Sequence, residues 1–130
     1  MNTKLLMTIS SLILGVTGIF LSFLPEEVSH VLSSSASTPV IFQILGALYF
    51  GFAMLNWTAK ANLIGGIYSR PVAIGNFTHF LIGGLALVKF VLHATNGTSF
   101  IWAWATVYLI FSVLFGYVLF TNPGSNNKFV

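Results

Sequence analysis

The sequence contains no cysteine and no aspartate, and its carboxylate side chains are limited to the adjacent Glu26 and Glu27. The absence of cysteine excludes a disulfide, a thiolate metal site, an iron–sulfur cluster and a cysteine nucleophile. Two neighbouring glutamates cannot provide a carboxylate metal cluster or a separated acid and base. His30, His79 and His93 lack metal-ligand spacing, because an ideal helix separates His79 from His93 by about 21 Å. We therefore expect no cofactor, no metal site and no enzymatic activity.

Charge of either sign is also scarce. Charged residues make up 5% of the 130 residues and hydrophobic residues 56%, whereas a soluble domain devotes about a quarter of its residues to charge. The main solvent of this chain is therefore expected to be a lipid bilayer. The formal net charge of +3 is too sparse for a nucleic-acid footprint, so nucleic acid is excluded as a partner.

Four apolar runs are each long enough to cross a bilayer. A helix of about 20 residues covers the hydrocarbon core of about 30 Å, and it satisfies its own backbone where there is no water. The first run is longer than the apolar core of about 7–15 residues found in a signal peptide, so we interpret it as a membrane helix. The predicted helices cover residues 5–24, 40–58, 72–93 and 100–120. The predicted fold is all-α, a transmembrane four-helix bundle in a single membrane domain, residues 1–130.

The connecting segments differ in charge, which gives them sides. The cations outside the predicted helix interiors lie on one side of a chain that crosses four times; they are Lys4, Lys60, Arg70 and Lys128. The opposite connections, residues 25–39 and 94–99, carry both glutamates and neither lysine nor arginine. The positive-inside rule then places both termini in the cytoplasm.

The segment 72–93 carries the most polar side chains within an apolar run. Projected as a helix, one arc of about 140° contains Gly75, Asn76, His79, Gly83, Ala86, Lys89 and His93. An ionisable side chain in a membrane span is costly, so this stripe should face the bundle interior or a watery cavity. The candidate binding residues on it are Asn76, His79, Lys89 and His93. The lipid side is left to residues such as Phe77, Leu81, Leu85 and Val88.

Each candidate on this stripe also has a plain structural interpretation. His79 and Asn76 can serve as interhelical hydrogen-bonding groups, which are ordinary in bundles. Lys89 can extend its ammonium to the headgroups. Alternatively, Lys89 pairs with Glu26 or Glu27 at the outer end of the first helix. The residue types alone leave these alternatives open.

The segment 40–58 has two faces that can line a pocket with the segment 72–93. One face holds Gln43, Gly46, Ala47, Phe50, Met54 and Trp57, and the other holds Tyr49, Ala53, Asn56 and Lys60. The candidate binding residues are Gln43, Tyr49 and Asn56. A mixed aromatic and amide lining suits a small, largely apolar ligand with one polar end, and it equally suits plain packing.

Small residues form stripes on the first and last predicted helices. The first stripe comprises Thr8, Ser11, Gly15, Gly18 and Ser22, and the second comprises Ala105, Tyr108, Ser112 and Gly116. Such stripes let helix backbones approach closely, which drives association in lipid. We expect both helices to pack through these stripes, within one chain or between chains, so that Gly15→Leu or Gly116→Leu forces helices apart.

Short glycine-rich pieces carry a resemblance to a family. They are Gly15-x-x-Gly18, Phe23-Leu24-Pro25-Glu26, Gln43-Ile44-Leu45-Gly46-Ala47, Asn56, Gly65-Gly66-Ile67-Tyr68, Arg70-Pro71 and Gly75-Asn76. With four predicted spans, the chain resembles uncharacterised bacterial four-helix membrane proteins of the broad DoxX-like group. The resemblance implies a multi-pass protein of a bacterial inner membrane, and it transfers no catalytic or binding residue.

These features predict a non-enzymatic membrane subunit, or a binder of a small lipid-like molecule in a polar cavity between helices. One alternative is a structural or assembly partner in a larger membrane complex. Another is an oligomeric passage for protons or anions that uses His79 and Lys89. The expected partners are the lipid bilayer, a small lipid-like ligand, and further copies of the chain or other membrane subunits.

Overall fold

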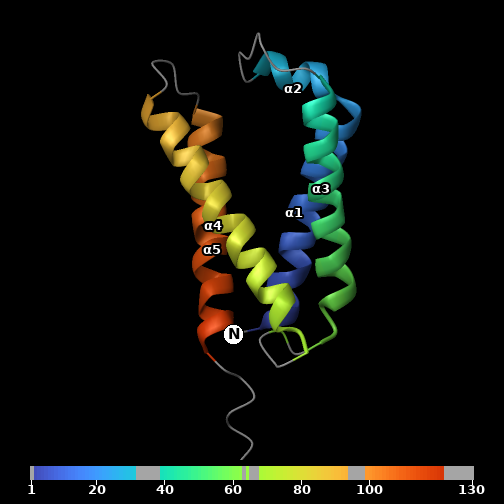
Figure 1. The fold of residues 1–130 in the computed structure, drawn as a ribbon, viewed down its shortest axis with the longest axis vertical. Coiled ribbons are helices and arrows are strands. Elements are labelled where there is room, and N and C mark those ends of the chain that lie inside the picture. Colours follow the sequence, from blue (N-terminus) through green and yellow to red (C-terminus); the bar gives the residue numbers. More distant parts are fainter. Residues whose placement is uncertain (1, 32–38, 63, 65–67, 94–98, 122–130) are drawn as a thin grey trace, which may run out of the picture. The chain divides into compact units, whose positions relative to one another are not determined.

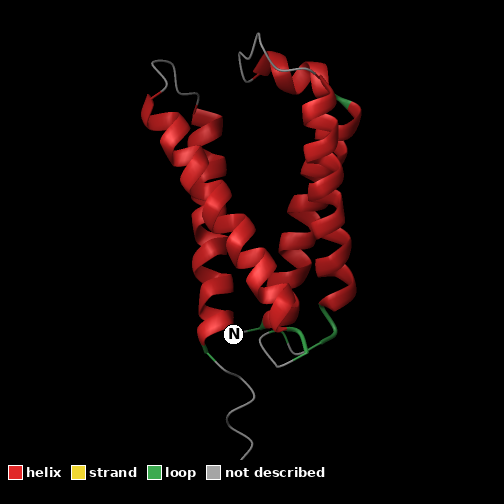
Figure 2. Ribbon diagram, in the orientation of Figure 1, coloured by secondary structure: helices red, strands yellow, loops and turns green. Residues whose placement is uncertain are grey.

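The computed structural model describes residues 2–31, 39–62, 64, 68–93 and 99–121. Within these residues the secondary structure is helical (Figures 1 and 2). The helices are α1 (Thr3–Phe23), α2 (Pro25–Val31), α3 (Pro39–Ala59), α4 (Arg70–His93) and α5 (Ser99–Phe120). Four of them, α1, α3, α4 and α5, are long and apolar enough to cross a membrane. The four predicted spans are thereby confirmed, with each boundary displaced by at most two residues.

The short helix α2 was not predicted, because residues 25–39 were interpreted as a connecting loop. Leu24 leaves the helical conformation and ends α1, and Pro25 begins the next helix. Proline suits a first helical turn because its fixed φ is helical and the missing N–H would be unsatisfied there. Glu26 and Glu27 lie in the same turn, where carboxylates complement the positive end of the helix dipole. The sequence also predicts turns at Gly65-Gly66 and Asn96-Gly97, a polar tract over residues 33–38 and a polar tail from residue 122, and all of these lie outside the described residues.

The chain divides into two compact units, Met1–Ala61 and Asn62–Val130. In the first unit α1 packs against α3, and α2 contacts both. In the second unit α4 packs against α5. Early residues of one helix meet late residues of its partner in both units, so each unit is an antiparallel helical hairpin; we call them the first and second hairpins. The expected four-helix bundle requires the two hairpins to pack on each other, and this packing stays a prediction.

The first hairpin is held by a close approach of two helix backbones. A Cβ atom added at Gly18 would lie 2.8 Å from the backbone nitrogen of Phe50 and 2.9 Å from the carbonyl oxygen of Gly46. One added at Gly46 would lie 2.7 Å from the backbone nitrogen of Ser22 and 2.8 Å from the carbonyl oxygen of Gly18. Real Cβ atoms essentially never come this near to backbone atoms. The two glycines therefore set the distance between α1 and α3.

The second hairpin is held by aromatic rings around Phe80 of α4. Its ring is fully buried and stacks on Phe111 and Phe115 of α5, with centroids 4.9 and 5.7 Å away. Tyr108 meets Phe80 edge to face at 5.2 Å. Aromatic pairs at these separations are favourable beyond the area they bury. In a bilayer this dispersion and quadrupole attraction matters more than in water, because lipid leaves no hydrophobic gain for helix association.

Both small-residue stripes pack within a hairpin. The α1 stripe meets α3 through Gly18 and Ser22. The four α5 stripe residues are all buried. A Cβ atom added at Gly116 would lie 3.1 Å from the ring of Phe77 on α4. Each stripe is therefore covered by the neighbouring helix of its own unit.

The expected lipid-facing position of Phe77 is wrong. Its ring lies against Gly116 and makes an edge contact with Phe120, with centroids 6.0 Å apart. The reason is the phase of α4, whose buried residues are Ala73, Asn76, Phe80, Gly84 and Val91. Around the helix axis, the centre of this packing face lies about a third of a turn from the centre of the polar stripe. Phe77 is next to the packing face and therefore contacts α5.

We expect Gly46→Ala to destabilise the full chain by about 1–3 kcal/mol, which is the range for overpacking a tight contact. The added methyl group would meet backbone atoms of α1, which cannot rotate away as a side chain can. Gly15→Ala is the matched control, since its Cβ would be at an ordinary 3.5 Å from the Ala53 Cβ. It should be neutral or stabilising by about 0.5–1 kcal/mol. Unfolding of both variants in mild detergent provides the measurement. Equal stability of Gly46→Ala and wild type would contradict the close approach.

Candidate functional site

The candidate binding residues lie on two helices in separate hairpins. Gln43, Tyr49 and Asn56 are on α3, and Asn76, His79, Lys89 and His93 are on α4. The pocket expected between these two helices stays a prediction. Within each hairpin, however, hydrogen-bond partners of Asn56, Asn76, His79 and His93 are defined.

Asn56 belongs to a polar cluster between α1 and α3. Its side chain is fully buried, and its Nδ2 donates to the Ser10 hydroxyl at 3.0 Å. The Ser10 hydroxyl in turn donates to the Met7 carbonyl at 3.0 Å. One residue further along α1, the Ser11 hydroxyl donates to the Ala53 carbonyl of α3 at 2.7 Å. This arrangement favours the packing interpretation of Asn56.

Of the two predicted faces of α3, the one with Tyr49, Ala53 and Asn56 turns toward α1. Ala53 and Asn56 are buried and Tyr49 is half-buried, whereas Gln43 is exposed. At the C-terminal end of α3 the Lys60 ammonium lies 2.8 Å from the centroid of the exposed Trp57 ring. A tryptophan with a cation over its face is suited to the headgroup region, where one side is apolar and the other wet.

Asn76 is buried against α5, and its Nδ2 donates to the Val72 carbonyl one turn earlier on α4, at 2.9 Å. This bond ties the amide group to its own helix. The bond to Val72 favours the packing interpretation of Asn76, and its role in binding stays a prediction.

His79 meets a partner from α5 that the sequence did not single out for chemistry. The Tyr108 hydroxyl lies 3.4 Å from His79 Nε2, and the two ring centroids are 5.6 Å apart. Tyr108 is 2% exposed, so its hydroxyl sits inside the hairpin. The sequence placed Tyr108 only in a stripe of small packing residues, although it is the one large polar member.

Gly83 makes the contact between His79 and Tyr108 geometrically feasible. A Cβ added at Gly83 would lie 2.7 Å from Tyr108 Cε1, so the tyrosine ring occupies the space that any side chain there would need. Gly83 lies four residues after His79, on the same face of α4. A glycine one turn from an intramembrane histidine was the available signal for an aromatic partner on the facing helix.

Lys89 and His93 lie on the exposed surface of α4. The His93 Nδ1 donates to the Lys89 carbonyl at 2.8 Å, because a carbonyl oxygen can only accept. Glu26 and Glu27 are both exposed on α2. Their expected pairing with Lys89 would join the two hairpins, and it stays a prediction. The predicted polar stripe is therefore divided, with Asn76 and His79 at the α5 contact and Lys89 and His93 outside it.

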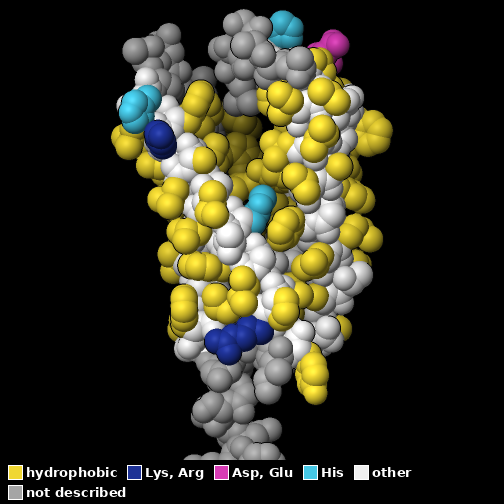
Figure 3. All heavy atoms as spheres, in the orientation of Figure 1, with side chains coloured by type: hydrophobic (Ala, Val, Ile, Leu, Met, Phe, Trp, Pro, Cys, Tyr) yellow, Lys and Arg dark blue, Asp and Glu magenta, His cyan; other side chains and the backbone are white. Residues whose placement is uncertain are grey.

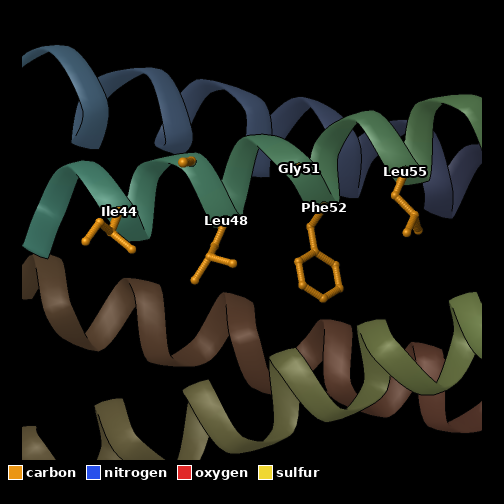
Figure 4. A pocket seen from close by; sticks show the side chains of 6 residues that line it. Ile44, Leu48, Gly51, Phe52 and Leu55 are labelled. Atoms are coloured by element: carbon orange, nitrogen blue, oxygen red, sulfur yellow. The ribbon is translucent and has the colours of Figure 1, made fainter.

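A shallow pocket lies on the face of α3 that turns away from α1. It is lined by Ile44, Ala47, Leu48, Gly51, Phe52 and Leu55. Figure 4 shows the larger of these side chains projecting from the same side of the helix. The lining is apolar and contains none of the candidate residues of α3. Figure 3 shows hydrophobic side chains widely distributed over the face of the molecule that it draws.

Comparison with protein-family models, with curated proteins and with solved structures found no match for this chain. The resemblance to DoxX-like proteins stays a prediction. Among the described residues no group of three or more histidine, cysteine, aspartate or glutamate side chains is placed to hold a metal ion.

We expect the Asn56–Ser10 hydrogen bond to appear as a coupling energy in a double-mutant cycle with Asn56→Leu and Ser10→Ala. The coupling should be roughly 0.5–2 kcal/mol, the range for interhelical hydrogen bonds in membranes. The control cycle combines Asn56→Leu with Thr58→Val, because the Thr58 hydroxyl donates within its own helix, to the Met54 and Leu55 carbonyls. Unfolding in mild detergent gives the four stabilities of each cycle. Equal coupling in both cycles would show that Asn56 acts by size alone.

Proposed function

We propose that this protein is a non-enzymatic subunit of a membrane assembly, one that acts by presenting helix surfaces within the bilayer. The four apolar helices make it a small membrane protein. Support for the subunit role comes from how its polar side chains are used. Asn56 and Asn76 are buried and bonded within their own hairpins, so these amides contribute to packing.

Gly51 is the observation that carries the proposal. Glycine in a helix costs about 1 kcal/mol relative to alanine, and elsewhere the hairpins offset this cost by close contact, as at Gly18, Gly46 and Gly83. At Gly51 no described atom lies within 4 Å of an added Cβ. The missing side chain instead leaves a notch in the apolar face of α3 that turns away from α1. A notch of this kind admits the backbone of another transmembrane helix.

A second copy of the chain is the partner that fits this surface most simply. In a two-fold dimer the same patch contacts itself, so Gly51 of one copy faces Gly51 of the other and both backbones can approach. The face carries no charge, and its flanking residues Ile44, Leu48 and Leu55 are exposed by 60%, 58% and 41%. They would interdigitate around the glycine contact.

A lipid-like molecule is the second candidate occupant, because the pocket has an apolar lining. An acyl or isoprenoid chain lying along α3 would need no hydrogen bond from the protein. Such a ligand does not need the expected polar cavity, since the apolar face of α3 that turns away from α1 provides the contact.

We expect Gly51→Leu to weaken the association of copies at least tenfold, equivalent to about 1.4 kcal/mol, because leucine fills the notch. Thermal stability of the hairpin should stay unchanged, since the introduced side chain points away from α1. Association is measured by energy transfer between labelled copies in liposomes over a range of protein-to-lipid ratios.

Ala103→Leu on α5 is the matched control, because Ala103 is also a small, exposed residue in an apolar helix. It should leave association as in wild type. Native mass spectrometry from mild detergent then distinguishes the occupants. A monomer that retains a lipid-like mass, lost in Gly51→Leu, would replace the second copy by a ligand, and unchanged association of both variants would refute the α3 interface.

We further propose that both termini face the cytoplasm, in a bacterial inner membrane. The first hairpin supports this, because its antiparallel helices bring Lys4 and Lys60 to one end while α2 carries Glu26 and Glu27 at the other. Arg70 begins α4 after the chain leaves the Lys60 end. Reporter fusions at each terminus should report a cytoplasmic location. An external signal from either terminus would contradict this orientation.

A further inference from the structure

His79 is an ionisable side chain well inside a membrane-spanning helix. It lies nine residues after Arg70, about 14 Å along the axis of α4, and ten residues before Lys89, about 15 Å away. Its ring is only partly exposed and is placed by contacts with Phe80 at 5.1 Å and Tyr108 at 5.6 Å between centroids. An intramembrane histidine held by a specific polar partner is a functional candidate by default.

The chemistry of its partner distinguishes His79 from His93. The carbonyl of Lys89 that bonds His93 is an acceptor only, so the bonded nitrogen must keep its proton. The Tyr108 hydroxyl can donate to a neutral imidazole nitrogen or, after rotation, accept from a protonated one. The His79–Tyr108 contact can therefore persist in both protonation states of the histidine.

The surroundings of His79 also suit a positive charge better than hydrocarbon does. The ring centroids of Phe80 and Tyr108 lie 5.1 and 5.6 Å from that of His79, and the face of an aromatic ring attracts a cation at up to about 6 Å. Tyr108 is a titratable group that faces His79 from α5. The other titratable tyrosine of α5, Tyr117, is exposed and lies nine residues further along.

We propose that His79 and Tyr108 form a proton-binding site within the membrane-spanning part of the second hairpin, assembled by the space that Gly83 leaves for the tyrosine ring. The ligand is a proton taken up by the imidazole, and the hydroxyl changes from donor to acceptor as the proton arrives. The observations that carry this site come from α4 and α5, and none of them depends on the proposed α3 interface.

The test is a pH titration of the full chain in lipid nanodiscs, followed by NMR of ¹⁵N-labelled histidine and ¹³Cζ-labelled tyrosine. His79→Gln assigns the His79 signals. In wild type, the His79 imidazole should take up a proton as the pH is lowered, and the Tyr108 Cζ resonance should shift at the same midpoint. Tyr108→Phe should lower the proton affinity of His79 about tenfold, because a hydrogen bond to a charged group is about twice as strong as a neutral one.

Gly83→Ala provides a second variant that keeps the hydroxyl but displaces the ring. It should shift the His79 midpoint in the same direction as Tyr108→Phe. His93 is the internal control, and its signals should be the same in all variants, because its ring bonds to the Lys89 carbonyl and takes no part in the His79–Tyr108 contact.

Two outcomes would overturn the proposal. One is a His79 that stays neutral throughout the pH titration in wild type. The other is a His79 midpoint that Tyr108→Phe leaves unchanged. If Tyr108→Phe fails to fold, the wild-type Tyr108 resonance decides. A shift at the His79 midpoint that disappears in His79→Gln supports the site, and a resonance that does not respond to pH refutes it.

Discussion

A polar side chain that a spanning helix carries into hydrocarbon must be bonded inside the protein, because lipid offers it no hydrogen-bond partner. Serine and asparagine side chains are short, so their partners on another helix must be near. In the first hairpin this nearness is created by Gly18 and Gly46, whose backbones almost touch. The Ser11 bond to the Ala53 carbonyl and the Asn56 bond to Ser10 become feasible at that distance. The polar contacts of the hairpin thus depend on its glycines.

The second hairpin meets the same constraint with larger side chains. Its helices are joined by stacked rings around Phe80, and a polar contact across them uses the long reach of Tyr108 to His79. In this hairpin the glycines make room for aromatic rings and not for a neighbouring backbone: Gly83 leaves space for the Tyr108 ring and Gly116 for the Phe77 ring. The two hairpins therefore differ in how they would accommodate a methyl group in place of a glycine hydrogen. At Gly46 the methyl group would meet backbone atoms, whereas at Gly116 it would meet the Phe77 ring, which must shift by a few tenths of an ångström.

The spans were predictable because length and hydropathy are local properties of the chain, and the boundaries of α1 and α3–α5 follow the apolar runs. The face that each helix buries was harder to predict. On α4 the sequence projection followed polarity, whereas packing follows Ala73, Phe80 and Gly84, so Phe77 was assigned to lipid in error. Tyr108 was missed because its partner lies 29 residues away, and no local pattern encodes that distance. The helix α2 was missed because its seven residues are too few to show a period.

The protons of a hydrogen-bonded polar group in a span can have one fixed arrangement or can rearrange, depending on the chemistry of the group and its partner. An amide that donates to a carbonyl, as Asn76 does to Val72, keeps one arrangement of its protons in that bond. The amide of Asn56 and the hydroxyl of Ser10 exchange no proton in any ordinary pH range. Imidazole with phenol differs, because both groups can donate and both can accept. The constraint that requires every polar group to be paired in the bilayer therefore leaves His79 and Tyr108 as a pair whose proton arrangement can change while the contact remains.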